Sequence, residues 1–237
     1  MMVLFGSARI DENGKITGGK PGDQTGREVA TQSYYMSSKG WIGLRQKDPL
    51  VAMKLAEAML EACNNNCIGY NQNKRSGVIT QLKTFGNLRR IAVNTDSDCS
   101  SLVRACVIQA TGKDPGNFTT ATEKQKLLAA GFHEVQIRKA ADCRTGDILV
   151  TKTKGHTVIV VSGELPEDLT EFMNKYRVIC ASINVRVKPG EISINKIIRV
   201  LKANTVVTVY EKKDGWGRIS PDKQEWISLN PKYMKEL

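Results

Sequence analysis

The spacing of hydrophobic residues in the first half of the chain predicts amphipathic helices. Residues 48–63 read DPLVAMKLAEAMLEAC, with Asp48 placed to cap the helix and Pro49 at its first position. Two further helices are expected over residues 76–86 and, more briefly, 121–131. In the first of these three helices, the apolar residues that recur at helical intervals are Leu50, Met53, Leu55, Ala58 and Leu60.

A fourth helix is expected over residues 98–112, DCSSLVRACVIQATG. Its apolar residues fall on one helical face, and Gly112 supplies a left-handed stop. Cys99 would therefore lie in the first turn. There, unpaired backbone N–H groups and the positive end of the helix dipole favour a thiolate over a thiol.

Apolar, β-branched runs predict strands elsewhere. Residues 147–153 and 156–163 resemble the two arms of an antiparallel hairpin that turns around Lys154 and Gly155, so that His156 opens the second strand. Residues 1–40 are rich in glycine and polar groups and predict loops with short strands. From Cys180 onward, short alternating strands separated by turn residues predict a small β-barrel.

These elements predict an α+β protein with two domains. Residues 1–163 would pack helices on an antiparallel sheet, and residues 180–237 would form the small all-β barrel. The charged segment 164–179, which contains Pro166, is expected to link them. In its 237 residues the chain has room for one mid-sized and one small domain.

Charge and composition narrow the possible partners. The formal net charge of +11 favours attraction to a polyanion. The basic residues are scattered and no basic block is interleaved with aromatics, so we expect an anionic wall polymer and no nucleic acid. No run approaches the roughly 20 apolar residues of a membrane span, and no secretory leader is visible, so we expect a soluble protein made in the cytoplasm.

The six cysteines and two histidines do not suggest a metal site. No CxxC pair is present, and only His133 and His156 could complete a zinc site, so we expect neither a metal nor another cofactor. Most of the cysteines are expected to be small buried residues in a chain that is made in a reducing compartment. His133, which follows a helix stop, is interpreted as structural.

One pair of residues could perform nucleophilic catalysis. His156 follows Cys99 by 57 residues and could serve as its base and then as acid for a leaving amine. A cysteine at a helix start is more often inert, and a histidine on a strand is more often structural. Sequence spacing alone leaves both alternatives open.

The contexts of these residues resemble a known family. DCSSLV around Cys99, followed by GDIL and then by KGHTVIVV around His156, is similar in content and order to the papain-like NlpC and CHAP peptidoglycan hydrolases and related phage amidases. The resemblance covers roughly Ile68 to Gly163. It implies a papain-like fold with Cys99 as nucleophile and His156 as general base.

Further site residues follow from the same resemblance. Tyr70, in IGY, resembles a tyrosine that borders the active site, although it could equally be a core aromatic. Backbone N–H groups at the helix start would form the oxyanion hole, with Asp98, Ser100 and Tyr70 as further oxyanion or substrate-binding candidates.

The strand that usually carries a third, histidine-orienting residue in this family is missing after Val161. Glu164 is one substitute, and Asp23 in the GDQTG loop is another. Asp23 and Gln24 are also candidates for binding substrate, because a glycine-rich loop with polar groups is costly to order unless it contacts something. A plain turn, with Asp23 and Thr25 capping backbone groups, is the alternative.

The C-terminal strands resemble bacterial SH3 domains over residues 181–237. The matching segments are INVRVKPG, KANTVVTVYEKKDGWGRI and EWISLNPKYM. The resemblance implies wall binding through aromatic side chains, for which Trp216, Trp226 and Tyr233 are the candidates. Trp216, in a GW step, is more often a core residue.

Together these features predict an endolysin, a bacteriolytic hydrolase of bacteriophage type. It would cut an amide of peptidoglycan as an amidase or an endopeptidase, work as a monomer without a cofactor, and reach the wall through a phage holin. A non-catalytic wall-binding protein with a decayed hydrolase domain is the main alternative. A basic nucleic-acid-binding protein, for which the Cys/His pattern would be accidental, is the other.

Overall fold

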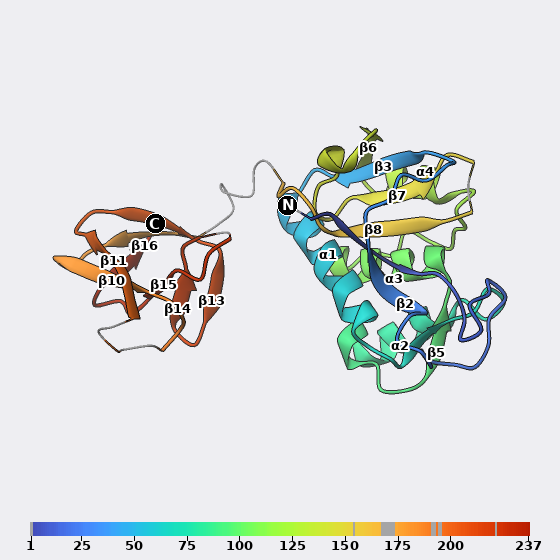
Figure 1. Ribbon diagram of the computed structural model, residues 1–237, viewed down its shortest axis with the longest axis horizontal. Helices are drawn as coiled ribbons and strands as arrows, with labels where there is room; N and C mark the ends of the chain where they lie inside the picture. The colour runs from blue at the N-terminus through green and yellow to red at the C-terminus, as the bar shows by residue number, and fades with distance from the viewer. Residues whose placement is uncertain (1, 154, 167–173, 191–192, 194–195, 221) are drawn as a thin grey trace. The chain divides into compact units, whose positions relative to one another are not determined.

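The chain forms two compact units, residues 1–167 and 168–237, in the computed structural model (Figure 1). The structure describes residues 2–153, 155–166, 174–190, 193, 196–220 and 222–237, so Lys154 and residues 167–173 of the expected linker lie outside the described residues. Strand β9 (Asn174–Val178) pairs with strands of the second unit, so this unit starts before the expected boundary at Cys180.

The first unit is built on a six-stranded sheet in which every neighbouring pair is antiparallel. A separate pair of short parallel strands lies beside it. In sheet order the strands are β2 (Val29–Ser33), β1 (Leu4–Ala8), β8 (Thr157–Ser162), β7 (Ile148–Thr151), β3 (Trp41–Gln46) and β6 (Phe132–Ile137), and the parallel pair is β4 (Ile68–Tyr70) with β5 (Thr95–Ser97).

The helices predicted from the hydrophobic pattern all form. They are α1 (Pro49–Cys63), α2 (Gly77–Phe85), α3 (Cys99–Thr111) and α4 (Glu123–Ala129), with short 3-10 turns at Leu88–Arg90 and Ala140–Asp142. The Asp48 carboxylate caps α1 by accepting hydrogen bonds from two backbone N–H groups, and Gly86 and Gly112 end α2 and α3 in the left-handed conformation. The expected mixture of helices with an antiparallel sheet is therefore confirmed.

The buried face of α1 matches the expected one in part, since Leu55 and Ala58 are buried as expected. Leu50 and Leu60 are exposed, whereas an alanine-rich stripe that includes Met59 is buried. The small side chains of this stripe allow a close approach to β1, where Gly6 has no Cβ. A Cβ at Gly6 would lie 2.4 Å from the Met59 side chain. The core therefore selects the side of α1 that fits against the sheet, and not its largest side chains.

The strand beside β8 comes from the start of the chain. Gly6 of β1 pairs with Ile159 of β8, and the antiparallel direction brings the end of β1 next to the start of β8. The sequence contains no strand-like segment directly after β8 that could occupy this position. The N-terminal segment fills it, so residues that follow β1 lie near His156.

The second unit contains two antiparallel sheets around a core that includes Val185 and Ile227. One sheet has the order β11-β10-β15-β14-β13 and the other β12-β9-β16. The strands are β10 (Ser182–Arg186), β11 (Ile197–Lys202), β12 (Val206–Val209), β13 (Glu211–Lys213), β14 (Trp216–Arg218), β15 (Trp226–Ser228) and β16 (Met234–Glu236). Closure into an SH3-like barrel stays a prediction.

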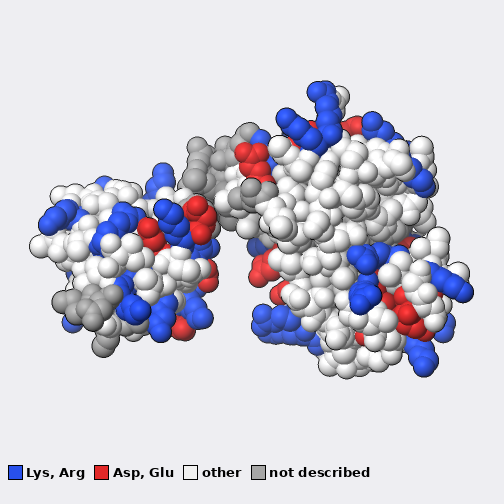
Figure 2. Space-filling view, in the orientation of Figure 1, with Lys and Arg blue, Asp and Glu red and all other residues white. Residues whose placement is uncertain are grey.

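Charged side chains are spread over the surface. On the face shown in Figure 2, lysine and arginine occur on both units and lie among aspartate and glutamate, so this face has no single basic patch. Within the described ranges, no helix is long and apolar enough to cross a membrane.

Candidate functional site

Cys99 is the first residue of α3, and the start of this helix is firmly held. The Asp98 carboxylate accepts a 2.6 Å hydrogen bond from the backbone N–H of Ser101, whose hydroxyl accepts one from the N–H of Asp98 at 2.9 Å. This capping box fixes the backbone on both sides of Cys99. The side chain is buried, with 8% of its surface exposed.

Burial makes Cys99 a thiol at neutral pH and not the thiolate expected from its helix position. Desolvation raises the pKa of this cysteine to about 12, and the nearby carboxyl groups of Asp98 and Glu123 act in the same direction. Hydrogen bonds from the backbone N–H groups of Thr157 and Ser100 oppose these effects without reversing them. The helix start alone is therefore not enough to ionise the sulfur.

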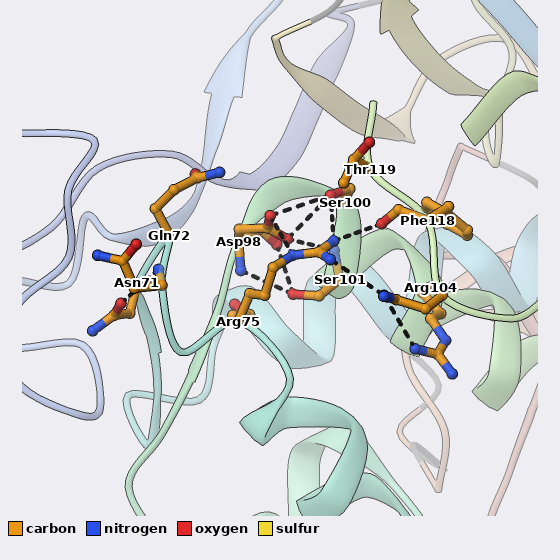
Figure 3. Close-up of polar contacts among 12 residues, drawn as sticks. Asn71, Gln72, Arg75, Asp98, Ser100, Ser101, Arg104, Phe118 and Thr119 are labelled. Carbon is orange, nitrogen blue, oxygen red and sulfur yellow. Dashed lines mark hydrogen bonds and ion pairs between the residues drawn. The ribbon is translucent and has the colours of Figure 1, made fainter. Parts of the chain in front are cut away.

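Arg75 connects the helix start to two other segments (Figure 3). Its Nε donates to Asp98 at 2.7 Å, and its Nη2 donates to the Ser100 hydroxyl at 2.7 Å and to the Phe118 carbonyl at 2.6 Å. The ion pair is mostly buried, because the two side chains are only 15% and 4% exposed. Asp98 and Ser100 are thus held by Arg75, a residue that sequence reasoning missed.

His156 immediately precedes β8. Its backbone carbonyl accepts from the N–H of Thr151, and its ring is largely buried. Desolvation, followed by the charge of Arg9, lowers the pKa of this histidine to about 4, so the ring is neutral at physiological pH. In the described part of the chain no hydrogen bond joins the ring to the Cys99 sulfur; the backbone N–H of Thr157 makes the contact.

A polar group from the N-terminal segment adjoins both Cys99 and His156. Arg9 follows β1 and donates to the Gln32 side chain at 3.0 Å. Burial raises the pKa of Tyr35, whose hydroxyl also senses Gln32 and the charges of Arg9 and Cys99. This group was not foreseen, because nothing local in the sequence indicates that β1 and β2 lie beside β8.

Tyr70 lies close to Cys99, as the resemblance implied. The parallel pairing of β4 with β5 sets Tyr70 opposite Ser97, two residues before Cys99. Its hydroxyl donates to the Gln72 side chain at 2.8 Å. Burial raises the pKa of this phenol well above its usual value, and the nearby Cys99 and Asp98 contribute, so it remains a hydrogen-bond donor.

The GDQTG loop is ordered by Asp23, in the way the plain-turn alternative described. The Asp23 carboxylate accepts hydrogen bonds from backbone N–H groups of residues 25–29 at 2.6 to 3.3 Å. Gln24 donates to two carbonyls of its own loop. No contact of either side chain with His156 is found in the described structure, so the assignment of Asp23 as the third catalytic member is not supported.

This loop nevertheless packs beside Tyr70. The buried Glu28 carboxylate accepts from the backbone N–H groups of Gln24 and Tyr70 at 2.7 and 3.1 Å. A Cβ on Gly69 would lie 2.2 Å from the Gly22 carbonyl oxygen, so β4 needs glycine at this contact. The loop thus gains its order from β4, which explains why a polar, glycine-rich segment is structured.

Glu164 lies at the wrong end of β8 to orient His156. It follows the last residue of the strand, whereas His156 precedes the first. Because a strand rises about 3.3 Å per residue, the two residues are about 25 Å apart. The assignment of Glu164 as a third catalytic member is therefore not supported. The aspartate of the GDIL motif is also structural, since Asp147 is buried and forms a two-pronged ion pair with Arg45.

The two tryptophans of the second unit differ in their exposure, Trp226 being buried and Trp216 lying at the surface. Trp226 is only 3% exposed and donates its Nε1–H to Gln224, so it belongs to the interior and is excluded as a wall-binding residue. Trp216 instead lines a surface hollow of about 340 Å³ together with Tyr233, Arg186 and Asn184. Tyr233 is 43% exposed and remains available to a ligand.

Comparison with known proteins identifies the family of the first unit. In the described residues no group of His, Cys, Asp or Glu could hold a metal ion, and all six cysteines are free thiols. No curated protein and no solved structure matches the chain significantly. The family model of the endolysin-like domain matches residues 5–165, a range that starts in β1 and ends shortly after β8. The chain therefore belongs to the endolysin-like domain family.

Proposed function

We propose that this protein is a peptidoglycan hydrolase that cuts an amide bond in the peptide part of the bacterial wall, with Cys99 as nucleophile and His156 as general base. Membership of the endolysin-like family supports a cell-wall function. The observation that carries the chemistry is the position of Cys99 at the start of α3, where the backbone N–H of Thr157 at the start of β8 acts to lower the pKa of its thiol. Thr157 is the residue after His156, so the two candidate residues belong to the same region of the first unit.

The reaction would proceed through a thioester. The Cys99 sulfur attacks the amide carbonyl carbon while its proton passes to neutral His156, and the C–N bond breaks as that proton passes to the leaving amine. Water, deprotonated by His156, then attacks the thioester, and the carboxylate product and the Cys99 thiol are released. The backbone N–H groups of Ser100 and Thr157 are the donors near the sulfur that could stabilise the oxyanion; the Tyr70 hydroxyl could join them only by giving up its hydrogen bond to Gln72.

The ring of His156 must come within hydrogen-bond reach of the sulfur for this step. Catalytic hydrogen bonds are often long in substrate-free enzymes and tighten when substrate binds. The charge of Arg9 suits a neutral imidazole, because a cation near the ring disfavours its protonation.

The rate of wall clearing should decrease only at an unusually low pH. His156 can accept a proton only when it is neutral, and its pKa of about 4 keeps it neutral throughout the range from pH 5 to pH 7. The initial rate of wall clearing, measured at constant ionic strength, should therefore be nearly flat over this range and should fall to half near pH 4. A half-maximal rate near pH 6.5 would show that His156 is not the desolvated base described here.

The function itself is tested against the two alternatives with purified walls. A hydrolase reduces the turbidity of a wall suspension and releases soluble peptides, whereas a decayed hydrolase domain sediments with the walls and leaves the turbidity unchanged. A nucleic-acid-binding protein would be retained on DNA more strongly than on walls, in a manner that decreases steeply with salt. We expect clearing of walls and weaker retention on DNA.

We further propose that the second unit binds the wall through the hollow beside Trp216 and Tyr233. Aromatic faces with a neighbouring arginine suit a wall peptide or glycan that carries a carboxylate. Release through a phage holin, action as a monomer and the absence of a cofactor belong to the same proposal. The amide that is cut could be the muramoyl-alanine link or a stem or cross-bridge peptide bond.

Trp216→Ala should weaken wall binding by about 10- to 30-fold, which is the effect of removing a central aromatic contact of about 1.4–2 kcal/mol. Binding is measured by sedimentation of the full chain with walls over a range of protein concentrations. The control is Ile198→Ala, which removes an exposed apolar side chain of the same unit that does not line the hollow. Equal binding by the two variants would exclude the hollow as the wall site.

A further inference from the structure

Glu123 is a buried carboxylic acid beside the candidate nucleophile, and the proposed reaction does not use it. It is the first residue of α4 and is fully inaccessible to solvent. Its Oε1 accepts a 2.7 Å hydrogen bond from the Thr157 hydroxyl, and no partner in the described chain contacts its equally buried Oε2. Burying a carboxyl group with an oxygen that has no hydrogen-bond partner costs free energy of folding. This cost suggests a functional reason for the position of Glu123.

The groups around Glu123 are those of the candidate site. Thr157, which donates to Glu123 through its hydroxyl, directs its backbone N–H toward the Cys99 sulfur. The Asp98 carboxylate acts on Glu123 from the residue before α3, and the Arg75 guanidinium acts from the segment before α2. Glu123 is therefore hydrogen-bonded to Thr157, and both residues act on the pKa of Cys99.

We propose that Glu123 is a protonated positioning residue that fixes the start of β8 against Cys99 and keeps a second negative charge away from the sulfur. This inference rests on the proposed function, because it assigns Glu123 to the same site. As an acid without a charge it can lie near Asp98 without repulsion. Its hydrogen bond to Thr157 holds both the N–H that faces the sulfur and the backbone that carries His156.

The proposal implies a change near pH 8. Burial raises the pKa of Glu123 to about 8, so the acid loses its proton only above that pH. The new carboxylate is then close to the sulfur and disfavours the thiolate. Two charges act on Glu123: Asp98 opposes its ionisation and Arg75 favours it. The hydrogen bond from the Thr157 hydroxyl also favours ionisation, but burial outweighs the effects of Arg75 and Thr157.

The test measures the reactivity of Cys99 separately from wall hydrolysis. Full-length wild type, Glu123→Gln and Glu123→Ala are alkylated with iodoacetamide between pH 6 and pH 10, and modification of the Cys99 peptide is followed by mass spectrometry. The wild-type rate should rise with pH and then lag above pH 8. Glu123→Gln, which mimics the protonated acid, should lack this lag and react about tenfold faster at pH 9.5, because one nearby charge is absent.

Wall clearing supplies the second readout. At pH 7 Glu123→Gln should clear walls at close to the wild-type rate, whereas Glu123→Ala, which cannot hold Thr157, should be at least about tenfold slower. Identical alkylation profiles for wild type and Glu123→Gln would overturn the proposal, even if Glu123→Ala fails to fold. A chain that clears no walls but shows the lag refutes the proposed function and leaves the role of Glu123 toward the Cys99 thiol supported.

Discussion

Cys99→Ala should lower the rate of wall clearing by at least about a thousandfold, which is the usual cost of removing a catalytic nucleophile. The side chain is small and buried, and the capping box formed by Asp98 and Ser101 does not involve the sulfur. The variant should therefore fold and should still sediment with walls. The measurement compares loss of turbidity with co-sedimentation in the same samples.

The matched control is Cys67→Ala, which removes another free thiol of the first unit. Cys67 lies just before β4, and its thiol takes no part in the contacts around Cys99. This variant should clear walls at nearly the wild-type rate. Continued clearing by Cys99→Ala, or equal losses in both variants, would refute the assignment of Cys99.

Arg75→Ala should produce the largest loss of stability among the polar residues of the site. It leaves the buried Asp98 carboxylate without its cation and removes the donors to Ser100 and to the Phe118 carbonyl. Breaking a buried ion pair in this way costs about 3–5 kcal/mol. Because the melting temperature of a unit of this size shifts by about 2–4 °C per kcal/mol, it should fall by roughly 6–20 °C.

Arg104→Ala provides the comparison. Arg104 also forms a two-pronged pair, with Asp114, and it is visible next to Arg75 in Figure 3, but Asp114 is 35% exposed. An exposed pair of this kind contributes about 0–1 kcal/mol. Urea unfolding of both variants gives the two free energies. If Arg75→Ala is no less stable than Arg104→Ala, Arg75 does not organise the helix start.

The parts of the fold that sequence could predict are those with a local physical cause. Asp48 and Asp98 cap helices through their own neighbouring N–H groups, and Gly112 ends α3 because it adopts the left-handed conformation. The hairpin of β7 and β8 follows from adjacent β-branched runs. These signals placed Cys99 at a helix start and His156 at a strand start before any contact was known.

The rest depends on contacts between distant segments. The pairing of β1 with β8 joins residues more than 150 positions apart, and no local pattern encodes it. For the same reason Arg75 and Glu123 escaped notice, since their roles arise only when the segment before α2 reaches the start of α3 and the start of α4 reaches β8. Burial also reversed two interpretations: it keeps Cys99 protonated, and it encloses Trp226 while Trp216 remains at the surface.

The central claim, cleavage of a wall amide through Cys99, is tested most directly by mass spectrometry of the fragments released from walls of defined structure. Wild-type protein should release fragments that carry one new amine and one new carboxylate, without new reducing sugar ends, and Cys99→Ala should release none. Reducing ends, or the same fragments from Cys99→Ala, would contradict the account.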